Sequence, residues 1–227
     1  MSDTDLKSPS RGERTRVQLM DIAQVAILEK GYAATSIDEL IAQAGITKSG
    51  FFYHFEDKLN LGKQLLRRDN EMIEAGLTQI FEAADKTHDC PLEALLEGVL
   101  RYGRAAAESP TERPGCLAAA FSYQEALFDE EVREAVRAGL VFRRRVLRER
   151  LERVVAKYPP AAPVDLEALA DMLVAVIQGG MVIDRVRDEP GVLQAQVELY
   201  CAYLRAVFKQ PGESSPSRPV SAASADL

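Results

Sequence analysis

Residues 36–63 constrain this chain more than any other segment, because their helix caps, glycine and aromatics fit one compact unit. Ser36 and Glu39 form a capping box that opens a short helix. Gly45 then turns the chain, and Thr47 caps a second short helix. Two short helices joined at a tight glycine turn form a helix-turn-helix, whose second helix enters the major groove of DNA. The segment therefore indicates sequence-specific DNA binding.

Helical periodicity dominates the remainder of the chain, and no segment alternates apolar and polar residues as a half-buried strand does. We therefore predict an all-α fold of nine helices without internal repeats. Segment 116–127 is apolar on most sides and is expected to be buried. The expected helices are one at about 11–30, one on each side of Gly45, a long one from Asp57 to a break at 86–91, and five more at about 92–107, 116–127, 129–157, 165–187 and 190–209.

Composition argues against several classes of protein. No apolar run approaches the ~20 residues that span a bilayer, and the first ten residues lack the apolar stretch of a secretion signal. The three cysteines, Cys90, Cys116 and Cys201, are far apart and odd in number. This pattern favours free thiols in a reducing cytoplasm over a disulfide scaffold or a zinc site. The sequence therefore predicts a cytoplasmic protein without a metal or another cofactor.

The net charge of −7 argues against a simple electrostatic attraction to nucleic acid. Positive charge is instead concentrated near the N-terminus. The residues there are Lys7, Arg11, Arg14 and Arg16, accompanied by Glu13 alone. A compact cationic arm beside a helix-turn-helix can neutralise phosphates while acidic residues face away from the DNA. The alternative is a solvated tail that makes no specific contact.

The helix-turn-helix segment also carries a family pattern. With Thr-Lys-Ser-Gly at 47–50, Phe-Tyr-His-Phe at 52–55 and Lys58 three residues on, the chain resembles the tetracycline-repressor (TetR) family of bacterial transcriptional regulators. The family pattern reads Ala-Gly-Val-Ser-Lys-Gly-Thr-Leu-Tyr-x-His-Phe-x-x-Lys-x-x-Leu, and the match is specific over residues 15–62. The matching positions are Ala44, Gly45, Ile46, Thr47, Lys48, His54, Phe55, Lys58 and Leu61.

Two positions depart from the family pattern. Gly50 stands where the family has Ser or Thr, and Phe52 stands where it has Tyr. The loss of that hydroxyl removes an expected DNA contact, which Tyr53 next door is able to replace. The departures leave open which residues read the bases, while the docking mode is unchanged.

The resemblance implies a ligand-responsive transcriptional regulator, expected to be a repressor, that binds a pseudo-palindromic operator as a homodimer and is released by a small-molecule effector. It implies a helix-turn-helix DNA-binding domain at 11–63 and a helical ligand-binding and dimerisation domain at 64–210. A flexible basic arm at 1–10 precedes them, and a Ser/Pro/Ala-rich tail at 211–227 is expected to be disordered. The residues expected to contact DNA are Arg11, Arg16, Ser36, Thr47, Lys48, Ser49, Gly50, Phe52, Tyr53, His54 and Lys58.

The last two expected helices carry apolar residues around much of their circumference, which implies burial on two sides, either in a dimer or in an extra-buried monomer core. The candidates for the dimer interface are Met172, Val176, Gly179, Gly180, Ile183, Val197, Tyr200 and Leu204. Ligand candidates are polar or aromatic residues on otherwise apolar helices, each of which could instead be plain core or surface. They are Tyr102, Cys116, Phe121, Tyr123, Gln124, Phe128, Phe142 and Gln178.

Charged and reactive residues of the same region have two interpretations each. Arg101, Arg104 and Arg143 could bind an anionic ligand, although charged positions on helices usually face water. Cys116 could react with an electrophile or be an inert buried thiol.

Two rival functions are weaker. An enzyme is disfavoured because the chain has two histidines and no nucleophile elbow, phosphate-binding glycine loop or His/Cys metal spacing. A helical small-molecule-binding protein without DNA-binding activity would be unaffected by the loss of Lys48 and Tyr53. The sequence specifies neither the effector nor the operator, and activation would require the same docking as repression.

Overall fold

The computed structural model of the 227-residue chain describes residues 10–108, 115–187 and 191–208. Within these ranges the regular secondary structure is entirely helical, which confirms the predicted all-α class. The predicted basic arm, apart from Ser10, and the predicted disordered tail lie outside the described residues. The helices are α1 (Arg11–Lys30), α2 (Ile37–Ala44), α3 (Lys48–His54), α4 (Lys58–Thr87), α5 (Pro91–Ala107), α6 (Leu117–Ser122), the 3₁₀ helix η1 (Glu125–Leu127), α7 (Glu130–Lys157), α8 (Leu166–Arg187) and α9 (Val192–Val207).

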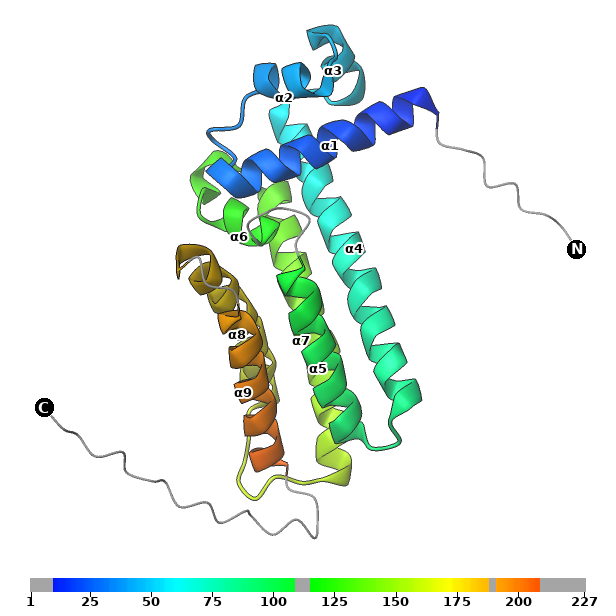
Figure 1. The fold of residues 1–227 in the computed structure, drawn as a ribbon, viewed down its shortest axis with the longest axis vertical. Coiled ribbons are helices and arrows are strands. Elements are labelled where there is room, and N and C mark those ends of the chain that lie inside the picture. Colours follow the sequence, from blue (N-terminus) through cyan, green and yellow to red (C-terminus); the bar gives the residue numbers. More distant parts are fainter. Residues whose placement is uncertain (1–9, 109–114, 188–190, 209–227) are drawn as a thin grey trace, which may run out of the picture.

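The helices form two groups (Figure 1). Helices α1, α2 and α3 lie together at one end of the molecule, where the first turns of α4 join them. The remainder of α4 runs away from that end and packs in a bundle with α5, α7, α8 and α9. Helix α6 lies between the groups, in contact with both α1 and α7. Because α4 takes part in both groups, it connects them without a break in its backbone.

Side-chain caps fix where the first helices begin. Ser10, Ser36, Thr47 and Asp57 each accept a hydrogen bond from a backbone N–H in the first turn of the helix that follows. Gly45 ends α2 with a φ of 66°, a left-handed conformation that glycine adopts without strain. The expected limits of the first helix and of the glycine turn are therefore confirmed.

The capping box predicted at the start of α2 forms only in part. The Ser36 hydroxyl accepts from the Glu39 N–H at 3.2 Å, as expected. The Glu39 carboxylate instead pairs with Lys30 of α1, and this ion pair lowers the pKa of Glu39. Glu39 therefore contributes to α1–α2 packing as well as lying in the first turn of its own helix.

The expectation of one buried helix over 116–127 is wrong. Helix α6 ends at Ser122, after which the backbone turns through i→i+3 hydrogen bonds into η1, a tighter geometry than the α-helix. Tyr123 is 84% exposed and Leu127 is also exposed, whereas Phe121 and Phe128 are buried. The two phenylalanines therefore anchor the ends of the segment, and the turn between them faces outward.

Two clusters of buried apolar side chains correspond to the two groups of helices. One lies among α5, α7, α8 and α9 with the distal part of α4, and it contains Phe81, Leu95, Leu151, Leu173 and Leu204. The other joins α1, α2, α3 and the start of α4, and it also contains Phe121, Phe128 and Val132. The core of the helix-turn-helix thus extends into α6 and the start of α7. The predicted domain boundary at 63/64 remains a prediction, and it falls inside continuous helix α4.

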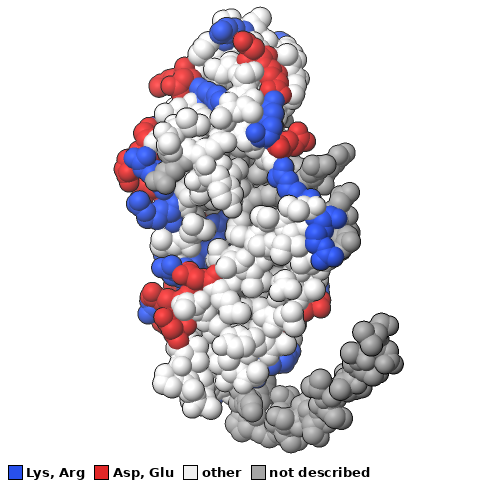
Figure 2. Space-filling model, turned by 90° about the vertical axis from the view of Figure 1, so that its left-hand side faces the viewer, with Lys and Arg blue, Asp and Glu red and all other residues white. Residues whose placement is uncertain are grey.

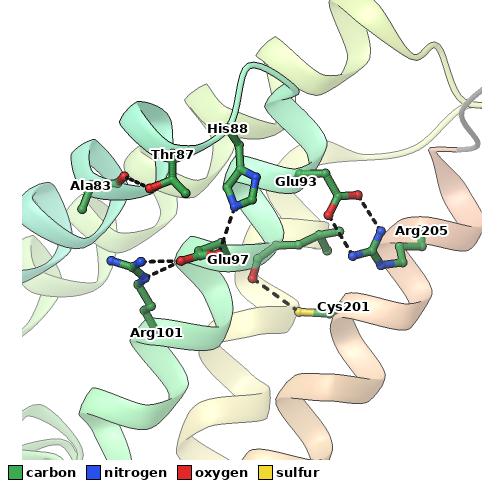
Figure 3. Close-up of polar contacts among 9 residues, drawn as sticks. Ala83, Thr87, His88, Glu93, Glu97, Arg101, Cys201 and Arg205 are labelled. Atoms are coloured by element: carbon green, nitrogen blue, oxygen red, sulfur yellow. Dashed lines mark hydrogen bonds and ion pairs between the residues drawn. The ribbon is translucent and has the colours of Figure 1, made fainter.

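Polar contacts join the turn between α4 and α5 to neighbouring helices at the far end of the bundle (Figure 3). The Arg205 guanidinium of α9 makes two hydrogen bonds to the Glu93 carboxylate of α5, at 2.6 and 2.9 Å. The His88 Nε2 lies 2.9 Å from the carboxylate of Glu97, which also binds Arg101. These contacts stabilise the end of the bundle opposite α3.

Helix α8 contradicts one compositional prediction. It is long and apolar enough to cross a membrane by length and composition, with a mean hydropathy of 1.7 over its most apolar window. The apolar runs of the sequence alone predict no such segment. Within the structure α8 packs against α7 and α9 and buries Leu169, Leu173 and Ile177 in the bundle core. Core helices pass the same compositional test, so this is weak evidence for a membrane span.

Candidate functional site

Helix α3 presents one face outward and fixes the other in the core. Phe51 and Phe55 are almost fully buried, with ring centroids 5.6 Å apart. On the opposite side Phe52 and Tyr53 are exposed, and Tyr53 reaches 82%. A short helix gains little stability from its own hydrogen bonds, so these two buried rings hold it in place. The expected exposure of a recognition helix is therefore present in the structure.

The start of α3 is polar and exposed. Thr47 accepts from the Gly50 N–H at 3.2 Å, and its hydroxyl lies 3.0 Å from that of Ser49. Lys48 is exposed, and its ammonium lies 3.8 Å from an Asp38 carboxylate oxygen. An exposed ion pair of this length is weak, because water screens both charges. Lys48 is therefore available to an anionic partner.

Other predicted DNA contacts are engaged within the chain. The Lys58 ammonium donates to the Ala33 carbonyl at 3.3 Å and lies 4.3 Å from the centre of the Tyr32 ring, and burial lowers its pKa. Arg16 donates to the Gln64 side chain, and its guanidinium carbon lies 5.6 Å from the centre of the Phe55 ring.

The three remaining predicted contacts differ in how far they reach outward. Ser36 uses its hydroxyl as the α2 cap. Arg11 is exposed in the first turn of α1. His54 is half-buried, with its ring 5.0 Å from that of Tyr53.

A cavity of about 390 Å³ lies between the two groups of helices, bounded by α1, α4, α5, α7 and α8 and by the segment before α6. Its wall is mainly apolar, formed by residues such as Leu28, Ile73, Leu77, Ile177 and Met181. Both its volume and its apolar lining are typical of small-molecule sites. Leu28 belongs to α1, so the cavity touches the helix-turn-helix unit directly.

A few polar groups converge on this cavity. Arg143 of α7 is only 2% exposed, and its Nε and Nη1 atoms have no hydrogen-bond partner among the described residues. Burial raises the pKa of Asp69, and the positive charges of Arg143 and Arg68 oppose the rise. Burial likewise raises the pKa of Tyr102, again opposed by Arg143. From the sequence alone, Arg143 is a possible anion-binding residue at a helical position that would ordinarily face water.

The structure brings three of the eight predicted ligand residues to this cavity: Tyr102, Cys116 and Gln178. The other five do not line it. Phe121 and Phe128 instead stack on each other, and the Tyr32 ring packs at an angle against both, at centroid distances of 4.8 to 5.2 Å. Tyr123 is exposed, because the segment turns outward there.

The remaining two residues are used elsewhere in the packing. The Gln124 side chain accepts from the Ala33 N–H at 2.9 Å, and Phe142 packs against the bundle core and Arg145. Asp69 and Gln24, which do line the cavity, were missed because charged and amide residues on amphipathic helices are usually solvated.

Comparison with known proteins supports the interpretation of α2 and α3 as a helix-turn-helix. A family model for bacterial regulatory proteins of the tetR family matches residues 19–65, which hold most of α1, all of α2 and α3, and the start of α4. The Transposon Tn10 TetC protein of Escherichia coli is 35% identical over 89 residues, which are 39% of this chain and 44% of that protein. The HTH-type transcriptional repressor BepR of Brucella suis is 27% identical over 94 residues, 41% of this chain and 44% of BepR.

The chain therefore carries a helix-turn-helix of the TetR family at residues 19–65. It spans less than half the length of either of these relatives. The likeness in fold is broader, since the crystal structure of a TetR-family transcriptional regulator from Agrobacterium tumefaciens matches with a TM-score of 0.71. That match covers 87% of this chain and 100% of the other at 21% identity. It therefore extends the TetR fold to the C-terminal helices, without indicating a ligand.

Contacts between the C-terminal helices and α1 connect the cavity to the TetR helix-turn-helix. Arg185 of α8 donates to the carbonyls of Leu28 at 2.9 Å and Glu29 at 3.2 Å, at the C-terminal end of α1. Lys63 of α4 lies 2.7 Å from Asp129 and 2.6 Å from Glu131, at the start of α7. These contacts join α8 to α1 and the start of α7 to α4.

An apolar face is exposed on α8 and α9 of the TetR fold. Figure 2 shows the side of the molecule on which these helices lie, where charged side chains are found mostly near the edges of the view. Several large apolar side chains are exposed on these two helices. They are Met172, Val182, Ile183, Val186, Leu199 and Tyr203. Exposed apolar side chains grouped on two neighbouring helices favour an interaction site on this face.

The prediction of dimer contacts is wrong for four residues, because they are buried inside a single chain. Val197, Tyr200 and Leu204 are at most 2% exposed, and the Tyr200 hydroxyl donates to the Leu169 carbonyl at 2.8 Å. Gly180 is buried at the α8–α9 crossing, where a Cβ would lie 2.7 Å from Leu193 Cα. These residues have no side-chain surface left to bury between two copies.

The other four predicted dimer contacts retain some accessible surface. Met172, Gly179 and Ile183 are exposed, and Val176 is half-buried. Their role at an interface remains a prediction.

Proposed function

We propose that this TetR-family chain is a ligand-responsive transcriptional repressor in the cytoplasm, which binds a pseudo-palindromic operator as a homodimer and releases it when a small molecule occupies the cavity. The observation that carries the proposal is the outward face of α3, formed by Lys48, Ser49, Phe52 and Tyr53. A helix held by buried Phe51 on its other face is suited to enter a major groove as a rigid element.

The exposed residues have distinct roles in this proposal. Lys48 contacts a phosphate or a guanine edge, and Ser49 is able to hydrogen-bond to either. Tyr53 places its hydroxyl along the phosphate backbone, and Phe52 contributes an apolar surface for thymine methyl groups. Lys58 acts indirectly, because its ammonium already holds the turn after α1 through Ala33 and Tyr32.

Dimerisation is supported by the apolar face of α8 and α9. A two-fold axis through this face would present two α3 helices to the same side of the DNA, with spacing matched to successive major grooves. The predicted contacts Met172, Gly179 and Ile183 remain on this face, and we add Val186 and Leu199 to them.

Release of the operator is supported by the position of the cavity. Its wall includes Leu28 of α1, and α4 contributes residues from Asp69 to Ile80. An effector that binds better when α4 and α1 have shifted would favour that state, and only such differential affinity can weaken DNA binding. A 100-fold loss of operator affinity corresponds to about 2.7 kcal/mol of coupling, near the upper end of the usual range.

The proposal is tested by fluorescence anisotropy with duplexes that carry inverted repeats from the chain's own promoter region. We expect salt-sensitive binding to one palindrome and a loss of at least about 10-fold in Y53A and K48A, since each removes a contact of 1–3 kcal/mol. Y123A is the matched control, because Tyr123 is as exposed as Tyr53 but lies outside α3. Equal affinity of wild type and both α3 variants, or of all duplexes, would contradict the proposal.

The alternative is a helical small-molecule-binding protein without DNA-binding activity. It predicts that no duplex binds specifically, while ligands still raise the thermal stability of the chain. A promoter–reporter assay then separates repression from activation, since both use the same docking on the operator.

A further inference from the structure

Two nitrogen atoms of the Arg143 guanidinium lack hydrogen-bond partners in a place where a charge is costly. The side chain is 2% exposed, and neither Nε nor Nη1 has an acceptor among the described residues. An arginine keeps its charge when buried, so it must find an anion or hydrogen-bond acceptors. Buried polar groups are nearly always paired in folded proteins, and an exception requires an explanation.

The neighbouring residues supply this partner only in part, because the Tyr102 hydroxyl hydrogen-bonds to the Arg143 guanidinium but carries no charge to balance it. The Asp69 carboxyl is close enough for Arg143 to oppose the rise in its pKa, but no carboxylate of the described residues forms an ion pair with Arg143 within 4.0 Å. The Asn70 amide donates to the Ala135 carbonyl, and Arg68 binds Asp21 and Gln24. Arg143 therefore brings a guanidinium with two unpaired nitrogen atoms to the wall of the cavity.

We propose that this cavity binds a small organic acid, an apolar molecule with a single carboxylate that pairs with the guanidinium of Arg143. Nε and one Nη of a guanidinium point in parallel and match the two oxygens of a carboxylate. The inference rests on the proposed function only in identifying this molecule with the effector.

The rest of the cavity decides between kinds of anion. Leu28, Ile73, Ile177 and other apolar side chains line the same cavity as Arg143, so the body of the ligand is a hydrocarbon chain or ring. A phosphate dianion would bring two negative charges towards one Arg143 and face the Asp69 carboxyl as well. A carboxylate brings one charge, which Arg143 balances. Asp69 is then placed to accept a hydrogen bond from a hydroxyl or N–H group on the ligand.

The first test needs no variant. Isothermal titration of the full-length protein without DNA compares decanoate and 4-phenylbutyrate with their neutral alcohols, 1-decanol and 4-phenyl-1-butanol, and with decyl phosphate. We expect at least one acid to bind about 30-fold tighter than its alcohol, as the loss of hydrogen bonds to a charged group implies. Equal affinity of acid and alcohol for both pairs, absence of binding by either acid, or tighter binding of decyl phosphate than of decanoate would overturn the proposal.

The second test places the effect at Arg143. R143M keeps a long apolar side chain and removes the charge, and it should reduce acid binding to the level of the alcohol. R145M is the control, because Arg145 is exposed on the same helix. Circular dichroism checks that both variants fold. If R143M does not fold, the acid–alcohol comparison on the unmodified protein remains the test of acid binding. Unchanged acid binding by folded R143M would refute the assignment.

Failure of this inference is distinguishable from failure of the proposed function. Acid that binds through Arg143 without weakening operator binding would leave the site intact and remove its role as effector site. If another ligand released the operator and no acid bound, the proposed function would stand and the acid site at Arg143 would be refuted.

Discussion

Adjacent glycines in α8 have opposite surroundings, and this makes Gly179→Ala and Gly180→Ala a matched pair. A Cβ at Gly179 would meet nothing within 4 Å, whereas a Cβ at Gly180 would lie 2.7 Å from Leu193 Cα and 2.8 Å from Leu193 Cδ1. Both positions are helical, so both alanines gain the same helix propensity of about 1 kcal/mol. Only Gly180→Ala must also push α9 away.

The size of the effect follows from that contact. The α8–α9 separation at Gly180 must increase by several tenths of an ångström to reach ordinary contact with backbone that cannot rotate away. Overpacking of this kind costs about 1–3 kcal/mol. After the gain in propensity, G180A should be less stable than wild type by about 1 kcal/mol and G179A more stable by a similar amount. The two melting temperatures should differ by about 4–8 °C.

The assay is thermal and urea unfolding followed by circular dichroism at one fixed protomer concentration, because dimerisation makes stability concentration-dependent. Analytical ultracentrifugation of G179A and wild type then compares the strength of their dimers. If Gly179 lies where two copies approach closely, G179A should weaken the dimer while stabilising the single chain. Equal stability of G179A and G180A would refute the close α8–α9 approach on which the estimate depends.

Three further predictions concern the helix-turn-helix and its connections. G50A should raise stability by about 0.5–1 kcal/mol, because a Cβ there meets only ordinary contacts, and a fall in operator affinity of this variant would show that DNA approaches the backbone at α3; unchanged urea unfolding would contradict the first part. R185M, which removes the hydrogen bonds to the carbonyls of Leu28 and Glu29, should reduce effector-induced release about 5- to 10-fold in anisotropy titrations while effector binding persists, and full release would argue against this connection. Burial raises the pKa of Tyr32 from 10.0 to about 12, because the folded chain favours the neutral phenol. The contribution of the neutral Tyr32 to the free energy of unfolding is therefore fully present below pH 10 and is lost as pH rises from 10 to 12. Wild type should then lose up to about 2 kcal/mol relative to Y32F in urea unfolding between pH 9 and pH 12, and parallel pH profiles of the two proteins would contradict this.

Local signals predicted much of the fold. Caps such as Ser36 and Thr47, together with the left-handed turn at Gly45, act over three or four residues, and the helix boundaries they indicated are present. The outward face of α3 was also predictable, because aromatic spacing on a short helix leaves Phe51 and Phe55 on the side that packs. These features depend on neighbours in sequence, which is why the sequence contains them.

The cavity and the apolar face could be predicted only in part. Periodicity identified α8 and α9 as apolar on two sides, but it did not show that Val197 and Leu204 face the core of their own chain. The aromatic residues Phe121 and Phe128 suggested a ligand site, yet both pack against Tyr32, about 90 residues earlier in the sequence. Such pairings join distant segments, and one sequence does not specify them.

Arg143 shows most clearly which features the sequence determines and which depend on tertiary packing. In the sequence it is the first of three consecutive arginines on a strongly charged helix, where solvent exposure is the ordinary outcome. Residue spacing determined that Arg143, Arg144 and Arg145 point in different directions around α7. Only the packing of α4, α5 and α8 decided that Arg143 is the one enclosed beside an apolar cavity, because burial depends on which helices cover a face.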